Sequence, residues 1–134
     1  NTHRAEFSID KLYSPENSNG RLGLLEMRAF EMPPHSRMSI TQMLLIRSII
    51  SRFWKNPLDR KLVRFGTELH DKYLLPHYIW EDFQDVIFDM NQAGYGLDKD
   101  WYEVFLDFRF PEMGKAQIGG IDVELRTAIE PWLV

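Results

Sequence analysis

Two acidic and two basic side chains in the first quarter of the chain have the types and spacing to do chemistry. Arg4 and Glu6 are two residues apart, and so are Glu26 and Arg28 in the apolar segment LLEMRAFEMPPH. Alternate side chains of a β-strand lie on the same face, so each pair would share one face of its strand. An unpaired charge is costly to bury, which means that these charges are either paired or used. Carboxylates and guanidiniums on rigid strands suit Mg²⁺ ligation and phosphate binding.

The two pairs are predicted to meet on a β-hairpin. Residues 3–13 alternate between apolar and polar types, and residues 14–20 (SPENSNG) have the composition of a turn. Residues 21–32 form the second strand, which ends at Pro33-Pro34 because proline cannot donate to a β-ladder.

The register of this hairpin decides which charges face each other. Closure that is symmetric about Asn17 places Glu6 opposite Arg28 and Ser8 opposite Glu26. Any register that keeps the same faces brings two Glu and two Arg into one patch. The commoner use of such residues is structural, as cross-strand ion pairs that add little stability. Spacing alone leaves both uses open.

Other polar residues have simpler interpretations. His35 follows two prolines and is expected in a loop, and Glu31 lies on the face opposite to Glu26 by parity. The segment Gly94–Gly96 lacks the preceding strand that a phosphate-binding loop needs, and we interpret it as a helix end.

Three helices are expected after the hairpin. The first, residues 39–55, begins with a capping box of Ser39 and Gln42 and ends at Asn56-Pro57. The second, residues 76–93, begins at Pro76 and ends at Gly94, and a short third helix follows Asp98. Residues 58–73 are ambiguous. The apolar side chains expected to face the core are Met43, Ile46, Ile50, Phe53 and Trp54 in the first helix and Ile79, Phe83, Val86, Ile87 and Met90 in the second.

The last part of the chain returns to β-structure. Phe108–Phe110 alternates, and Gly119-Gly120 separates two alternating runs, which is a strong hairpin signal. Ile121, Val123 and Leu125 are expected on one face of that hairpin. The predicted fold class is α+β, an antiparallel sheet of the N-terminal and C-terminal hairpins with two or three helices on one face, in a single domain of residues 1–134.

The amino-acid composition and net charge exclude several classes of protein. The chain has 134 residues, 44% of them hydrophobic, a net charge of −4 and no cysteine. The acidic balance argues against nucleic acid as a partner, since phosphate binding needs a basic face. The lack of cysteine excludes disulfides and thiolate chemistry and fits a cytoplasmic location. The most apolar run, residues 43–50, is too short for a membrane span. The chain begins at Asn1 without Met, and we expect it to be a piece of a larger protein.

Four segments carry a resemblance to a known family: NTHRAEFSIDKLYSPENSNGRLGLLEMRAFEMPPH, GTELHDKYLLPH, FRFPEMG and VELRTAIEPW. They make the chain similar to the C-terminal part of a bacterial family of putative amidoligases. Proteins of that family are long and often carry an N-terminal transglutaminase-like domain. The family is in turn distantly similar to glutamine synthetase and glutamate–cysteine ligase, which are carboxylate–amine ligases.

The resemblance implies a partial glutamine synthetase-like catalytic domain, in which ATP phosphorylates a carboxylate and an amine attacks the acyl phosphate. By this resemblance Glu6 and Glu26 are Mg²⁺ ligands. Arg4 and Arg28 are catalytic clamps that bind ATP phosphate or substrate, and His3 contacts phosphate. The implied partners are the remainder of the same polypeptide, which completes the site, and carboxylate and amine substrates that are small molecules or peptides. The isolated fragment would then be inactive.

Two other functions are weighed against this one. The first is a non-enzymatic structural or partner-binding module of a long protein, whose charged hairpin is an ion-pair lattice. The second is a hydrolase or protease, for which the sequence offers no Cys, no GxSxG and no helical HExxH.

Overall fold

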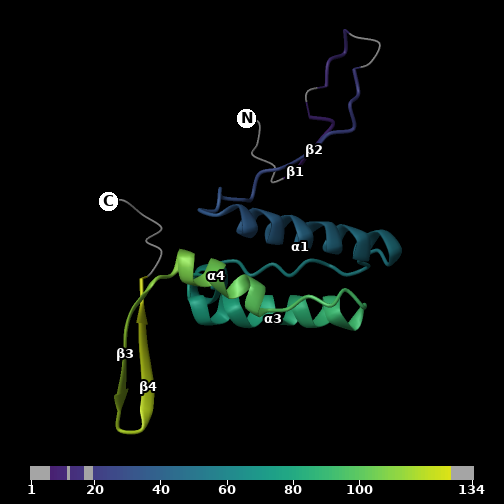
Figure 1. Ribbon diagram of the computed structural model, residues 1–134. Helices are drawn as coiled ribbons and strands as arrows, with labels where there is room; N and C mark the ends of the chain where they lie inside the picture. The colour runs from purple at the N-terminus through teal and green to yellow at the C-terminus, as the bar shows by residue number, and fades with distance from the viewer. Residues whose placement is uncertain (1–6, 12, 17–19, 128–134) are drawn as a thin grey trace. The chain divides into compact units, whose positions relative to one another are not determined.

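The computed structural model describes residues 7–11, 13–16 and 20–127. These form, in chain order, two strands, four helices and two strands (Figure 1). The chain divides into two compact units, Asn1–Pro34 and His35–Val134. The mixture of helices with antiparallel strands confirms the predicted α+β class. The prediction of one sheet made of both hairpins is wrong for the described residues, because each hairpin pairs only with itself and forms its own two-stranded sheet.

The N-terminal unit contains the first hairpin. β1 (Phe7–Ile9) pairs antiparallel with β2 (Leu25–Met27), and Ser8 lies opposite Glu26. This confirms the register predicted from closure about Asn17. The apolar side chains of the two strands alternate with Ser8 and Glu26, so they occupy the other face of the ladder.

Both strands are shorter than the predicted ranges 3–13 and 21–32. Asp10 and Gly23 adopt left-handed backbone conformations, with φ of 55° and 64°, and these interrupt the ladder on the turn side. The hairpin continues there through single backbone hydrogen bonds, such as that from the Lys11 N–H to the Leu24 carbonyl at 3.0 Å. On the other side β2 ends at Met27, well before the prolines.

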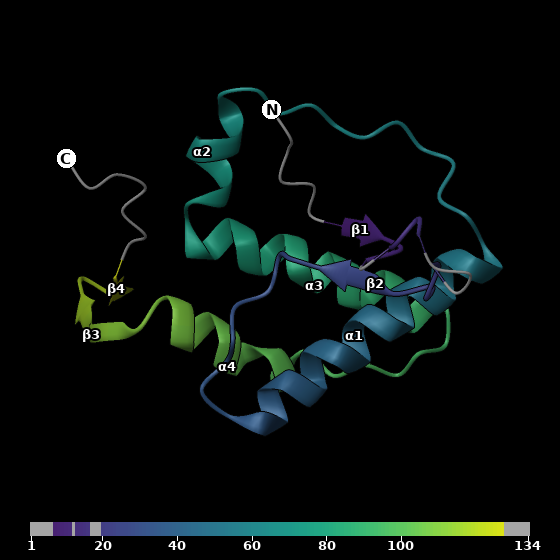
Figure 2. The same cartoon turned by 90° about the horizontal axis from the view of Figure 1, so that it is seen from above.

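The C-terminal unit contains the helices. α1 spans Ser36–Lys55, α2 spans Glu68–Tyr73, α3 spans Pro76–Gln92 and α4 spans Asp100–Arg109. α1 and α3 correspond to the two long predicted helices, and α2 lies in the segment that was ambiguous. Figures 1 and 2 show α1 lying alongside α3 and α4, which it contacts, and a long loop leading from α1 to α2.

The start of α1 differs from the prediction. His35 is the N-cap, and its Nδ1 accepts a hydrogen bond from the Arg37 N–H at 3.1 Å. The predicted capping box of Ser39 and Gln42 is therefore wrong, because both residues lie within the helix. The predicted stop is confirmed, since Asn56 is the C-cap.

The other predicted helix ends agree more closely with the structure. Pro76 occupies the first turn of α3, and Gly94, with φ of 88°, directly follows the C-cap residue of that helix. Near the start of α4, Asp98 Oδ1 accepts a hydrogen bond from the Asp100 N–H at 3.0 Å. Proline fits a first turn because its missing N–H has no helical partner there.

The core lies between α1, α3 and α4. Its most buried side chains are Ile87, Met90, Leu97 and Tyr102, with Leu45, Ile49, Trp80, Phe83, Tyr95 and Phe105 packed against them. The prediction for α3 is confirmed at Phe83, Ile87 and Met90, whereas Val86 is exposed.

The predicted core stripe of α1 is wrong at four of its five residues. Met43, Ile50, Phe53 and Trp54 are exposed, with Trp54 at 87%, whereas Ile46 is half-buried. The helix instead turns Leu45, Ile49 and the buried Ser48 inward. The physical reason is that α1 carries apolar residues on more than one side, so that periodicity detects an apolar stripe without deciding which one the neighbouring helices cover.

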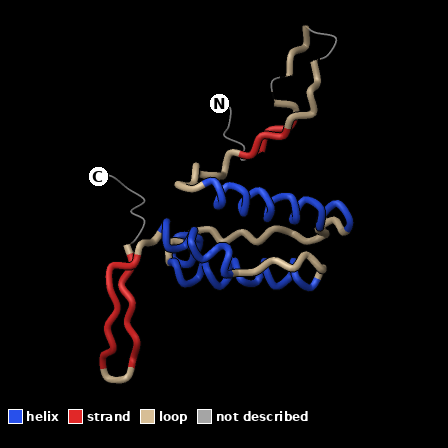
Figure 3. The backbone as a smooth tube through the Cα atoms, viewed as in Figure 1, coloured by secondary structure: helices blue, strands red, loops and turns tan. Residues whose placement is uncertain are grey.

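The second hairpin follows α4 directly. β3 (Glu112–Ile118) pairs antiparallel with β4 (Ile121–Arg126) around Gly119-Gly120, whose φ angles of 60° and 82° suit the predicted two-residue turn. Figure 3 shows these strands as a long arm that extends away from the helices. The predicted strand at Phe108–Phe110 is wrong, because Phe108 and Arg109 close α4 and Phe110 is its C-cap. Three residues are too few to distinguish the two periodicities.

A β-bulge in β3 determines which side chains of the arm lie on the same face. The register shifts between Glu112 and Gly114, which brings Glu112 and Lys115 to the same face. The predicted parity of β4 is confirmed beyond the bulge. The apolar face carries Ala116, Ile118, Ile121, Val123 and Leu125, and the polar face carries Glu112, Lys115, Gln117, Asp122, Glu124 and Arg126.

Candidate functional site

The polar face of the N-terminal hairpin brings Glu26 and Arg28 together, as their spacing predicts. Arg28 Nε donates a hydrogen bond to Glu26 Oε2 at 2.7 Å, and Lys11 Nζ lies 2.9 Å from the same oxygen. The hydrogen bonds from Lys11 and then from Arg28 lower the pKa of Glu26 below its usual 4.5. The Glu26 side chain is 34% exposed. It is therefore an ionised carboxylate that solvent and ligands can reach.

Sequence reasoning missed Lys11 as a member of this cluster. Strict alternation places Lys11 on the apolar face, together with Phe7 and Ile9. The left-handed conformation of Asp10 breaks that alternation, so the Lys11 side chain reaches Glu26 instead. Aspartate is one of the few residues that tolerate this conformation, and its position directly before Lys11 is the signal that could have revealed the change.

The remaining predicted site residues lie outside the described part of the chain. They are His3, Arg4 and Glu6. The pairing of Glu6 with Arg28, and the patch of two Glu and two Arg, therefore stay predictions. Within the described residues, the structure brings together Glu26 and Arg28.

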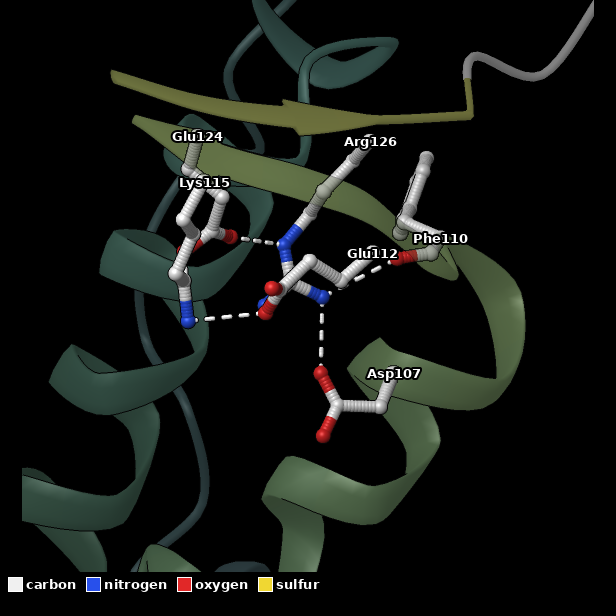
Figure 4. Close-up of polar contacts among 6 residues, drawn as sticks. All are labelled: Asp107, Phe110, Glu112, Lys115, Glu124 and Arg126. Atoms are coloured by element: carbon white, nitrogen blue, oxygen red, sulfur yellow. Dashed lines mark hydrogen bonds and ion pairs between the residues drawn. The ribbon is translucent and has the colours of Figure 1, made fainter. Parts of the chain in front are cut away.

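A second polar cluster joins the arm to α4, and we call it the hairpin clamp. At its centre Arg126 Nη1 donates to Asp107 Oδ1 at 2.7 Å and to the Phe110 carbonyl at 2.9 Å, while Nε donates to Glu124 (Figure 4). Lys115 Nζ lies 2.7 Å from a Glu112 oxygen and 3.1 Å from a Glu124 oxygen. The clamp consists of Asp107, Phe110, Glu112, Lys115, Glu124 and Arg126.

Three ionisable groups in the clamp have their charged forms stabilised by their neighbours. The hydrogen bonds from Arg126 and then Lys115 lower the pKa of Glu124 below its usual 4.5. Glu112, followed by Glu124, raises the pKa of Lys115. The hydrogen bond to Asp107, followed by that to Glu124, raises the pKa of Arg126.

The clamp has the chemistry of a structural ion-pair network. Its two cations contact its carboxylates and one backbone carbonyl, so that opposite charges in the clamp are paired with one another. Among the described residues, no group of three or more His, Cys, Asp or Glu side chains could hold a metal ion. The sequence did not reveal the clamp, because Phe110 lies in a segment where a strand was predicted and Asp107 directly precedes that segment.

A shallow groove at the end of α3 offers less chemistry. It is lined by Asp85, Asn91, Asp98 and Lys99 together with apolar residues of α3. The Asn91 amide is already used, since it accepts from the Leu97 N–H at 2.6 Å and donates to the Leu97 carbonyl at 2.7 Å. The backbone at the end of the groove is therefore held by the Asn91 side chain, whose amide is not available to a ligand.

Comparison with known proteins adds to this geometry. Within the described residues, no helix has the length and apolar character needed to cross a membrane. No curated protein and no solved structure matches the chain. A family model described as "Putative amidoligase enzyme (DUF2126)" matches residues 1–134, so the chain belongs to this amidoligase family, which places it at a coarse level among the ligases.

Proposed function

We propose that this chain is part of an ATP- and Mg²⁺-dependent carboxylate–amine ligase that acts in the cytoplasm and is distantly related to glutamine synthetase and glutamate–cysteine ligase. The observation that carries the proposal is the exposed Glu26–Arg28 pair on the first hairpin, in a chain that matches the amidoligase family over its whole length. Strands hold such groups in fixed positions, which a ligand-binding site requires.

The residues of the hairpin would bind and orient rather than react. ATP, bound with Mg²⁺, would activate a substrate carboxylate by transferring a phosphoryl group to it with release of ADP, so that an amine could then displace phosphate. Arg28 would bind a phosphate or carboxylate through its planar guanidinium, which offers two parallel donors. Glu26 would contribute negative charge to the metal.

Glu26 fits one ligand of Mg²⁺ but does not make a complete site. Its described contacts, with Lys11 and Arg28, all use Oε2, and Oε1 takes part in none of them. Mg²⁺ needs six oxygen ligands in nearly octahedral arrangement and retains waters when few carboxylates are present. We assign a second ligand to Glu6, with Arg4 and His3 as further contacts to phosphate, and the remaining positions to water and to the phosphates of ATP.

The rest of the site would come from other parts of the same polypeptide, which in this family resemblance include an N-terminal transglutaminase-like domain. The exposure of this chain supports such a partner. Among the residues that the structure describes, the buried hydrophobic side chains are Ile87, Met90, Leu97, Tyr102 and Phe110, while large apolar residues are exposed on both hairpins and on α1. Exposed apolar surface of this extent is typical of protein that is covered by other protein.

The test compares turnover with stability in the longer protein that contains these residues. Glu26→Gln removes the charge and keeps the shape, so we expect ADP formation with mixed amino acids to be lost while the melting temperature changes little. Arg28→Ala should also weaken the binding of MgATP or of the carboxylate substrate, measured by calorimetry. Lys11→Met is the matched control, because Lys11 touches Glu26 but has no proposed ligand. The isolated 134-residue chain should show no turnover.

A non-enzymatic structural module is the second candidate. The observation that favours it is that Glu26 Oε2 is shared by Lys11 and Arg28, as in a structural ion-pair lattice. This function predicts the reverse pattern, with normal turnover and a markedly lower melting temperature for Glu26→Gln, since the two cations would lose their partner. That result would show that the hairpin charges are scaffold.

A further inference from the structure

The side of α1 that faces away from the core is apolar and exposed. Ile40 is 68% exposed, Met43 58%, Ile50 44% and Trp54 87%. Together with the exposed Arg47 between them, these residues follow one another along the helix at separations of three and four. This is the spacing of a seam along which one helix packs lengthwise against another. We call these five residues the outer stripe of α1.

The charges in and around the outer stripe are almost all positive. Arg47 lies at the midpoint of the stripe, and among the described residues no carboxylate pairs with it. α1 contains no acidic residue, and residues 36–64 contain seven basic residues and one acidic residue, Asp59, in a chain whose net charge is −4. The outer stripe therefore joins apolar contact area to an unpaired positive charge, a combination that favours a partner carrying negative charge.

Arg47 also distinguishes between the kinds of partner that could cover the stripe. The stripe is symmetric about Arg47, so a second copy packed in register on it, parallel or antiparallel, would place Arg47 against Arg47. A membrane surface fits poorly as well, because a membrane-binding helix keeps its cations on the polar face, whereas Arg47 lies in the middle of the apolar stripe. A partner helix with a carboxylate in the middle of its own seam satisfies both the charge and the apolar contacts.

We propose that the outer stripe of α1 binds an acidic amphipathic helix of a partner protein. The partner helix presents apolar side chains to the four apolar residues of the stripe and a Glu or Asp side chain to Arg47. The apolar contacts supply most of the affinity, as in other complexes in which a helix packs through one apolar face. The single ion pair in the seam fixes the register and discriminates against helices that lack the acidic residue.

An exchange of charge between the two helices tests the ion pair. The probes are two synthetic amphipathic helices of about three heptads, identical except for a glutamate or a lysine at the central seam position and used below the concentration at which they self-associate. Fluorescence anisotropy of the labelled peptides should show that the chain binds the glutamate peptide at least about tenfold more tightly than the lysine peptide. Arg47→Glu should reverse this preference. Lys61→Glu makes the same charge change at an exposed loop position, so it is the matched control and should leave the preference unchanged.

A second pair of variants tests the apolar contacts. Met43→Gln keeps the length of the side chain and makes it polar, so it should weaken the binding of the glutamate peptide by about tenfold. Leu62→Gln makes a similar change at a loop residue that is 84% exposed, and it should leave the binding unchanged. Far-UV circular dichroism checks that all the variants fold.

Three results would overturn the proposal. The first is that the chain binds neither peptide, or that Arg47→Glu has the same preference as the wild type. The second is a dimer in sedimentation equilibrium that Met43→Gln abolishes, which would identify a second copy as the occupant. The third is co-sedimentation with phosphatidylserine vesicles that Met43→Gln abolishes, which would identify a membrane. None of these assays involves ATP, so their failure would leave the proposed ligase function untouched.

Discussion

Replacing Arg126 by methionine should release the β3–β4 arm from α4 while the helices stay folded. Methionine keeps the apolar length of the side chain and removes the donors that bind Asp107, Glu124 and the Phe110 carbonyl. The Arg126 side chain is only 17% exposed, so its contacts are shielded better than those of the other charged groups in the clamp.

The size of the effect follows from what each partner loses. Asp107 is 57% exposed and regains water, so its ion pair is worth about 0–1 kcal/mol after solvent screening. Glu124 keeps Lys115 as a partner. The Phe110 carbonyl belongs to a residue that is 2% exposed, and leaving such a group without a donor costs about 1–3 kcal/mol. We therefore expect Arg126→Met to lower the free energy of unfolding by about 2 kcal/mol, and the melting temperature by about 4–8 °C.

Urea unfolding measures the total, and hydrogen exchange shows where the stability is lost. The amides of β3 and β4 should exchange faster in Arg126→Met, whereas those of the central turns of α3 should keep their protection. Arg126→Lys should recover only part of the loss, because one ammonium cannot reproduce the guanidinium geometry. Lys61→Met, at an exposed loop position, serves as the control and should change stability by less than about 0.5 kcal/mol. An Arg126→Met protein with wild-type stability and unchanged exchange in the arm would refute the role of the clamp.

Three further predictions concern acidity, helix capping and core polarity. The pKa of Glu124 is lowered by Arg126, so the stabilising contribution of this carboxylate is present above pH 4.5 and is lost as the pH falls through the folded-state pKa. In Glu124→Gln, the free energy of unfolding should therefore fall less steeply with decreasing pH in that range. His35→Ala should cost about 1 kcal/mol in urea unfolding, and His35→Asn, which can cap, should cost less. Tyr102→Phe should leave the melting temperature unchanged or raise it, because it removes a buried hydroxyl without a hydrogen-bond partner in the described structure. The control Tyr95→Phe should lower the melting temperature, because it removes the 2.9 Å hydrogen bond to a serine hydroxyl.

The parts of the fold that the sequence predicted correctly are those controlled by neighbours in the chain. The register that pairs Ser8 with Glu26 follows from a turn of known position and from strict alternation on either side. Gly119-Gly120 specifies a two-residue turn because both positions need positive φ. Pro76 and Asn56 mark helix ends through the hydrogen bonds they can or cannot make. Local backbone chemistry is sufficient for each of these.

The candidate site could be predicted only in part. The proximity of Glu26 and Arg28 follows from their spacing of two residues in extended backbone at the end of β2. The contact from Lys11 could not be predicted by alternation, because it depends on the backbone of Asp10, whose left-handed conformation is tolerated by aspartate but not required by it. The pairing of Glu26 with two cations rather than one is therefore a result of the folded backbone.

Sequence by itself determined the α+β class, the two hairpins, the long helices and the polar and apolar faces of each strand, because these depend on interactions between residues close together in the chain. Only the tertiary structure decided that α1 buries Leu45 and Ile49 instead of Met43 and Ile50, and that Arg126 reaches back to Asp107 on α4. Both outcomes depend on which elements lie next to each other in space. A helix with apolar residues on several sides can bury any of them at a similar gain in free energy, and packing against its neighbours selects the one that is buried. In the same way, an arginine on an exposed strand can reach several carboxylates until the position of α4 selects one.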